Sequence, residues 1–174
     1  ILQAEGLVES QHPGMVVTGI RPEDINELYS LRGALEGLAV RMVTMRCDKG
    51  QLARIGRFVD LMQDAADAND PAAFALADID FHNEICVLSG HKRLADVWQQ
   101  YKETMMTLLR LTIFLDQDLQ VSTASHKELF ELIKAGEPGA AEAELANHLE
   151  GSRKRMVQVW EKALERRRNA AQPQ

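Results

Sequence analysis

The sequence predicts an all-α fold, an antiparallel bundle of about six helices. Aromatic residues make up only 5% of the chain and β-branched runs are scarce, which favours helices over strands. Apolar residues recur at intervals of three and four through most of the 174 residues, the spacing of one helix face. Short breaks, three of which contain proline or glycine, separate these stretches. Short connections between helices favour antiparallel neighbours, which is the arrangement of a helical bundle.

The first 20 residues depart from this helical pattern. Residues 1–6 are typical of the last turn of a helix that stops at Gly6. Residues 7–9 and 15–18 alternate like short strands around a turn at His12-Pro13-Gly14. A helix end followed by a hairpin resembles the tail of a winged helix-turn-helix, in which the recognition helix is followed by the wing. The local pattern is equally compatible with an ordinary N-terminal hairpin.

Each predicted helix has a recognisable start or stop. Pro22, followed by two acids, marks the first turn of the first helix, and Asp70-Pro71 is a cap-plus-proline start for the third. Gly90 and Gly136 follow the ends of two helices, and Pro138 restarts the chain. The predicted helices cover about 21–46, 48–69, 70–89, 92–115, 122–135 and 137–168.

Composition and charge narrow the class of protein. The net charge of −6 makes the chain as a whole a poor partner for a nucleic-acid backbone. Cys47 and Cys86 lie far apart without metal-ligand spacing, which fits a reducing cytoplasm better than a disulfide framework. The chain contains no apolar run of the length that a membrane span needs. We therefore expect a cytoplasmic protein with no membrane association.

Ligand-type side chains recur on the apolar faces of three predicted helices. Asp78 and His82, four residues apart, point the same way on the third helix, and His126 and His148 occupy similar positions on the fifth and sixth. A single histidine on an apolar face is usually a hydrogen-bonded core residue. Three histidines and a carboxylate on facing helices instead indicate a metal site in the bundle. These ligands suit zinc, nickel, iron or manganese.

Arg32 lies on the apolar side of the first helix, between Leu28 and Leu35. A guanidinium in that position needs an anionic partner. Glu36, four residues later, could supply the anion within the helix. Alternatively, Arg32 could clamp the carboxylate of a bound ligand through two hydrogen bonds. The sequence leaves both alternatives open.

Four short motifs follow one another along the chain: Leu28-Tyr29-Ser30-Leu31-Arg32-Gly33-Ala34-Leu35-Glu36, Asp78-Ile79-Asp80-Phe81-His82, Ser125-His126-Lys127-Glu128 and His148. In order and separation, with 44 residues from His82 to His126 and 22 from there to His148, they resemble the FCD ligand-binding domain. That domain is the C-terminal half of the FadR branch of GntR-type bacterial transcription regulators. Residues 5–17 are similar to the end of the winged-helix domain of the same regulators.

The resemblance implies a particular site. The family's metal ligands, one aspartate and three histidines, fall on Asp78, His82, His126 and His148, and its helix-one arginine falls on Arg32. A divalent metal ion, zinc before nickel, manganese or iron, and a small organic acid beside it are then expected. The chain departs from the family at Ser89-Gly90-His91, where the third residue is usually asparagine. That departure puts a local capping role in doubt. It could bring another imidazole near the cavity, but a surface position is expected instead.

The resemblance also implies a function and a division of the chain. Residues 1–20 are expected to be the remnant of a DNA-binding domain that is otherwise missing, and residues 21–174 the effector- and metal-binding domain. The leading hypothesis is an effector-sensing module that acts as a homodimer, binds a small carboxylate metabolite and controls operator DNA through the missing domain. The alternative is a metal-dependent hydrolytic enzyme built in a helical bundle. Every inward polar residue placed by the pattern already serves as a ligand, so no catalytic residue is predicted and the non-enzyme hypothesis is preferred.

Overall fold

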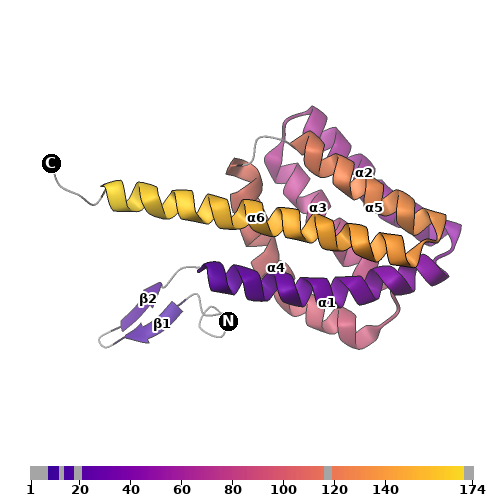
Figure 1. The fold of residues 1–174 in the computed structure, drawn as a ribbon, viewed down its shortest axis with the longest axis horizontal. Helices are drawn as coiled ribbons and strands as arrows, with labels where there is room; N and C mark the ends of the chain where they lie inside the picture. The colour runs from indigo at the N-terminus through magenta and orange to yellow at the C-terminus, as the bar shows by residue number, and fades with distance from the viewer. Residues whose placement is uncertain (1–7, 12–13, 18–20, 116–118, 171–174) are drawn as a thin grey trace.

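The computed structural model describes residues 8–11, 14–17, 21–115 and 119–170. Two short strands, β1 (Val8–Gln11) and β2 (Gly14–Val17), pair antiparallel with Val8 opposite Val17. Six helices follow (Figure 1). They are α1 (Pro22–Arg46), α2 (Lys49–Asp67), α3 (Pro71–Leu88), α4 (Lys92–Leu115), α5 (Leu119–Ala135) and α6 (Pro138–Ala170).

The helices form the expected all-α bundle. Helix α1 packs mainly against α6, and Figure 1 shows these two long helices side by side. Helix α3 packs between α2 and α4, and α5 packs against α2 and α6. The predicted helices are therefore confirmed, with one shift: α5 begins at Leu119, earlier than the predicted residue 122. Helix α3 also contacts α1, which brings the first and third helices together in the interior.

Local signals set the helix boundaries. Asp48 accepts a hydrogen bond from the backbone N–H of Gln51 (2.8 Å), and the Gln51 side chain returns a bond to the N–H of Asp48. Asp70 caps α3 in the same sense by accepting from the first backbone N–H groups of that helix. Gly90 and Gly136, just beyond α3 and α5, have φ angles of 70° and 77°. Both are in the left-handed region that favours glycine, so these two helix stops were correctly predicted.

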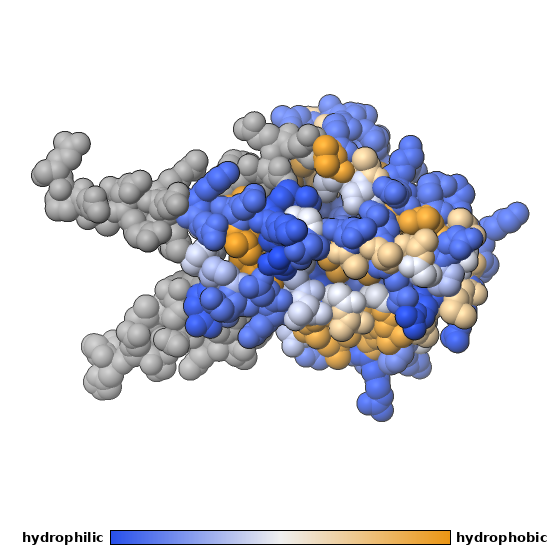
Figure 2. Space-filling model, viewed as in Figure 1, coloured by the Kyte–Doolittle hydropathy of each residue, from blue (hydrophilic) through white to orange (hydrophobic). Residues whose placement is uncertain are grey.

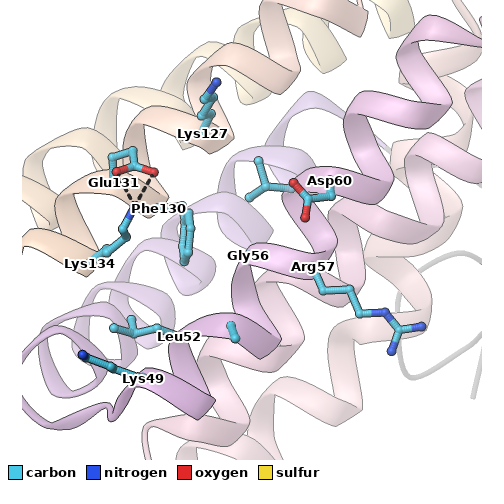
Figure 3. Close-up of a pocket in the computed structure, with 11 residues that line it drawn as sticks. Lys49, Leu52, Gly56, Arg57, Asp60, Lys127, Phe130, Glu131 and Lys134 are labelled. Atoms are coloured by element: carbon cyan, nitrogen blue, oxygen red, sulfur yellow. Dashed lines mark hydrogen bonds and ion pairs between the residues drawn. The ribbon is translucent and has the colours of Figure 1, made fainter.

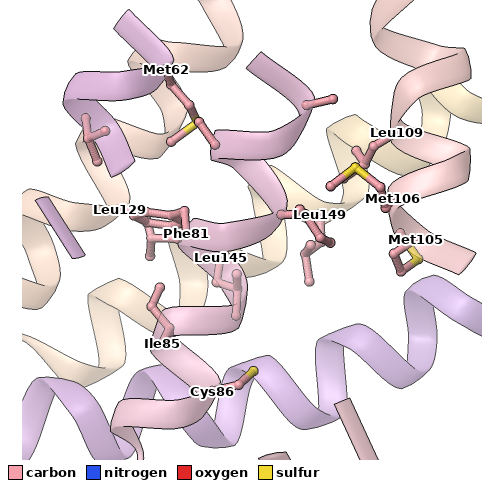
Figure 4. Packing of buried hydrophobic residues seen from close by; sticks show 14 of the residues in the cluster. Met62, Phe81, Ile85, Cys86, Met105, Met106, Leu109, Leu129, Leu145 and Leu149 are labelled. Carbon is pink, nitrogen blue, oxygen red and sulfur yellow. The ribbon is translucent and has the colours of Figure 1, made fainter. Parts of the chain in front are cut away.

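A continuous apolar core fills the space between the helices (Figure 4). The close-up shows side chains from α2, α3, α4, α5 and α6 meeting there. Among them are Met62, Phe81, Met105, Leu129 and Leu145. Several polar side chains are buried within the same interior, among them Arg32, Glu36, Asp78, His82, His126 and His148. Because buried polar groups require partners, this polar cluster is the feature that the apolar core has to accommodate.

Two expectations fall near the N-terminus. Residues 1–6, assigned to the end of a recognition helix, and the turn residues 12–13 lie outside the described residues. The antiparallel pairing of β1 and β2 does not identify the domain from which these strands come. Their assignment to a winged helix therefore stays a prediction.

Within the described part of the chain, no helix combines the length and the apolar character needed to cross a lipid bilayer.

Candidate metal centre

The structure brings three histidines from three helices together. His82 of α3, His126 of α5 and His148 of α6 each direct one ring nitrogen to a common point, where the three nitrogens lie within 4.8 Å of one another. The ring centroids of His126 and His148 are 4.3 Å apart, and that of His82 lies 5.4 and 5.3 Å from them. All three side chains are buried. Residues that are remote in sequence thus form one compact group of nitrogen donors.

Asp78 lies beside this group, one helical turn before His82. Its Oδ1 is 3.7 Å from Nε2 of His82, and its Oδ2 is 3.5 Å from Nε2 of His126. These separations are too long for good hydrogen bonds. Within the described residues, Oδ1 and both nitrogens have no hydrogen-bond partner although they are buried. Two imidazole nitrogens and a carboxylate oxygen left unpaired around one point are a donor set that suits a divalent metal ion.

In His126 and His148, the nitrogen that points away from the common point has a hydrogen-bond partner. Nδ1 of His126 lies 2.8 Å from the backbone carbonyl oxygen of Ser122, to which it donates. Nδ1 of His148 lies 3.0 Å from Oγ of Ser125. Metal-binding histidines usually have their second nitrogen hydrogen-bonded in this way, because the bond fixes the ring orientation and the tautomer. For His126 the protonated Nδ1 leaves Nε2 with a free lone pair.

Burial keeps His126 and His148 neutral. It lowers the pKa of His126 to about 4, although the nearby Asp78 carboxylate partly opposes the shift. Burial lowers the pKa of His148 well below its usual value, and the neighbouring His126 and His82 rings lower it further. A metal ion binds unprotonated imidazole, so both rings are in the competent form at neutral pH.

Arg32 and Glu36 form a buried ion pair on α1. Arg32 Nε donates to Oε1 of Glu36 over 2.6 Å, and both side chains are nearly inaccessible, at 3% and 1% exposed. The guanidinium also lies over the rings of Tyr29 and Trp98, 5.2 and 5.8 Å from their centroids. The intrahelical pairing that the sequence left open is therefore present. A cleft of only about 10 Å³ opens beside Arg32 between α1 and α4, so a ligand there would have to displace side chains.

Glu36 makes a second contact that the sequence analysis missed. Its Oε2 lies 2.6 Å from Nδ1 of His82, although the N–H direction is bent away from a linear hydrogen bond. Burial alone would raise the pKa of Glu36, but Arg32 and His82 outweigh that effect and hold the pKa at about 2. Glu36 is therefore a carboxylate shared by a guanidinium and an imidazole. Its position on the inward face, four residues after Arg32, was the only signal in the sequence.

His91, the departure from the family pattern, has a local role. Its Nδ1 accepts a hydrogen bond from the backbone N–H of Leu94 (3.2 Å), in the first turn of α4. The backbone N–H of His91 donates to Oγ of Ser89. His91 thus caps a helix as an asparagine would, and the doubt about a capping role is resolved in favour of the cap. It is not part of the group formed by His82, His126 and His148.

A wide groove lies elsewhere, on the outer face between α2 and α5 (Figure 3). It encloses about 650 Å³. Phe130 stands at its centre against Gly56, and Lys134 pairs with Glu131 over 3.0 Å at its rim. None of the clustered histidines lines this groove, so it is separate from the metal-type site.

Comparison with known proteins identifies relatives among transcription regulators. The chain is 30% identical over 149 residues to a probable D-xylose utilization operon transcriptional repressor of Paenarthrobacter nicotinovorans, a match that covers 85% of this chain. It is 21% identical over 113 residues to the gluconate operon transcriptional repressor of Bacillus licheniformis, covering 65% of this chain. These matches span 65% and 46% of the two relatives, so the chain corresponds to part of each.

The fold has counterparts among solved structures. One is a transcriptional regulator titled as a GntR family member, from Pseudomonas syringae pv. tomato, with a TM-score of 0.70 and 22% identity. The similarity covers 92% of this chain and 68% of that one. The family model of the FCD domain matches residues 27–151, which include Glu36, Asp78 and the three clustered histidines. The chain therefore belongs to the FCD domain family.

Proposed function

We propose that the chain is the effector-sensing domain of a GntR-type transcription regulator, and that it binds a divalent metal ion through Asp78, His82, His126 and His148. The observation that carries this proposal is the convergence of three buried imidazoles on one point, where the Nε2 atoms of His82 and His126 are unpaired. A nitrogen-rich donor set favours zinc, and nickel, manganese and iron are the alternatives for the same site.

The charges of the site support binding of a cation and then an anion. Arg32, Glu36 and Asp78 are the buried ionised side chains of the described residues, and together they carry one net negative charge when the imidazoles are neutral. A divalent ion would reverse the balance to one net positive charge in an apolar interior. An organic carboxylate would neutralise that charge, with Arg32 as a second contact. Small hydroxy acids or sugar acids suit a polar metal site, and one relative is named after a gluconate operon.

We propose that operator DNA is controlled through a further domain, since the matches span only 65% and 46% of the two repressors. The net charge of −6 argues against DNA binding by this chain as it stands. The histidines come from α3, α5 and α6, of which α5 packs against α6 while α3 reaches the site from its place against α1, α2 and α4. An ion held by all three imidazoles would therefore favour one arrangement of these helices over others. In a homodimer, such a change would alter the spacing of two DNA-reading heads.

A metal titration tests the proposal. Protein purified without chelator, or reloaded with zinc by dialysis, should contain about one zinc ion per chain, as a structural site of this kind would. His148→Ala should lose most of that zinc. His91→Asn is the matched control, because it removes an imidazole outside the group and leaves a side chain able to cap α4. A parent protein that takes up neither zinc nor nickel would disprove the metal site.

The hydrolytic alternative has no supporting observation. Glu36, the buried carboxylate next to the cluster, is engaged by both Arg32 and His82, and the relatives named above are repressors. We therefore retain the regulatory function.

A further inference from the structure

We infer that Glu36 is a positioning residue, which holds His82 as the tautomer whose Nε2 can bind the metal and ties that ring to Arg32. The inference rests on the proposed function for the identity of the site. It concerns a residue of α1, whereas the proposed ligands come from α3, α5 and α6.

The first step concerns a proton. Oε2 of Glu36 and Nδ1 of His82 lie 2.6 Å apart, and both are 1% exposed. An ionised carboxylate is only an acceptor, so two lone pairs at this separation would repel each other. A proton on Nδ1 removes the repulsion and lets the ring donate to the carboxylate. The neutral ring then has its lone pair on Nε2, the nitrogen that faces Asp78.

The second step concerns the shared carboxylate. The other oxygen of Glu36 accepts from Arg32 Nε at the same short distance, 2.6 Å. In the other two rings Nδ1 is hydrogen-bonded to a serine of α5: His126 to the carbonyl oxygen of Ser122, and His148 to Oγ of Ser125. Of these three outer partners only that of His82 is a charged group, and it is also bound to Arg32. A ligand that draws Arg32 away would therefore change the hydrogen bonding behind a metal-facing imidazole.

A merely structural reading is that Glu36 only neutralises a buried arginine. The two readings differ in their consequences for His82. If Glu36 only offsets the charge of Arg32, then removing its charge lowers stability but leaves the tautomer and the metal affinity unchanged. If Glu36 positions His82, both of these properties change, since outer partners of metal-binding histidines typically contribute 10- to 100-fold to affinity.

The decisive experiment measures zinc affinity by competition with a chromogenic chelator. Glu36→Gln keeps the size of the side chain and removes its charge, and should weaken zinc binding by about 10- to 100-fold. Glu142→Gln is the matched control, because the Glu142 carboxylate on α6 pairs with an exposed arginine of α1, Arg41. This variant should bind zinc as the parent does. Equal affinities of the parent and Glu36→Gln would overturn the inference, whereas a parent that binds no zinc would overturn the proposed function instead.

A second measurement holds even if Glu36→Gln fails to fold. Long-range ¹H–¹⁵N correlation spectra of the metal-free parent report which ring nitrogen of each histidine carries the proton. His82, assigned with a His82→Gln variant, should be protonated on Nδ1. Protonation on Nε2 in the parent would contradict the inference whatever the metal measurements show.

Discussion

Two arginine–glutamate pairs, one within α1 and one between α1 and α6, have the same chemistry in opposite surroundings. Arg32 and Glu36 are 2.6 Å apart with side chains 3% and 1% exposed, whereas Arg41 and Glu142 are 2.8 Å apart with side chains 58% and 26% exposed. Water can replace either partner of the outer pair. In the interior, a charge that loses its partner has no substitute. The comparison shows that burial, rather than the contact itself, makes such a pair a constraint on the fold.

The largest expected effect comes from breaking the inner pair. Arg32→Met should destabilise the metal-free protein by about 3–5 kcal/mol, because Glu36 is left buried and charged. Arg41→Met should leave the urea midpoint essentially unchanged. The double variant Arg32→Met/Glu36→Met should recover part of the loss, since it removes the orphaned charge. Equal midpoints for the two single variants would show that burial does not distinguish the pairs.

Acidic pH should also lower the free energy of unfolding, because it acts on the buried histidines. The pKa of His126 in the folded protein is about 4, below the usual value of 6.5, so the unfolded chain takes up protons first as the pH falls. Its contribution to stability is therefore fully present above pH ~6.5 and lost as the pH falls towards ~4, a change of about 3 kcal/mol. His148 shifts in the same direction.

Urea unfolding of the metal-free protein at several pH values measures this loss. His126→Gln should flatten the dependence in that window, while His91→Asn should retain it. A parent whose stability is constant between pH 6.5 and 4 would show that His126 is not held neutral by burial.

A metal ion should stabilise the fold through the buried histidines and not through the exposed pair of Arg41 and Glu142. Zinc at about 100 times its dissociation constant should stabilise the fold by about 2.7 kcal/mol, because it binds the folded state and not the unfolded one. Chelator should reverse the gain, His148→Ala should abolish it and Arg41→Met should keep it. Differential scanning calorimetry with and without zinc gives the comparison. An equal gain in His148→Ala would place the bound metal outside the histidine group.

The smallest effect concerns the backbone of two helices. Gly33 is exposed in α1, and a Cβ there would meet no atom within 4 Å, so Gly33→Ala should stabilise by about 0.5–1 kcal/mol. At Gly56 in α2 the added Cβ would lie 2.9 Å from Cζ of Phe130, which should offset the same gain. Thermal denaturation of both variants would test whether space or helix propensity decides, and identical shifts would mean that Phe130 moves without cost.

The helices were predictable because their signals are local. A cap such as Asp70 or a stop such as Gly136 acts within a few residues, and periodicity identifies the face of each helix that turns inward. That periodicity was enough to expect His126 and His148 in the interior. The start of α5 was predicted three residues too late, although Asp118, a residue type favoured at N-caps, stands directly before Leu119 in the sequence.

The contact of Glu36 with His82 was beyond local reasoning. It depends on the rotation of α1 relative to α3, which the spacing of apolar residues does not specify to within a side chain. The sequence therefore offered two roles for Arg32, partner of Glu36 or ligand clamp, but it gave no indication that Glu36 would face an imidazole as well. The capping role of His91 has a similar origin, since it rests on the orientation of a single ring.

Trp98 gives the site an optical signal of its own. The chain has two tryptophans; Trp98 is 1% exposed with the guanidinium of Arg32 5.8 Å from its ring, while Trp160 is only partly buried. An indole shielded from water emits at shorter wavelengths than an exposed one, and its quantum yield depends on nearby charges. Movement of Arg32 would therefore change the blue component of the emission and leave the component from Trp160 as an internal reference. Intrinsic fluorescence of the unlabelled protein can thus follow events at the centre of the bundle in real time.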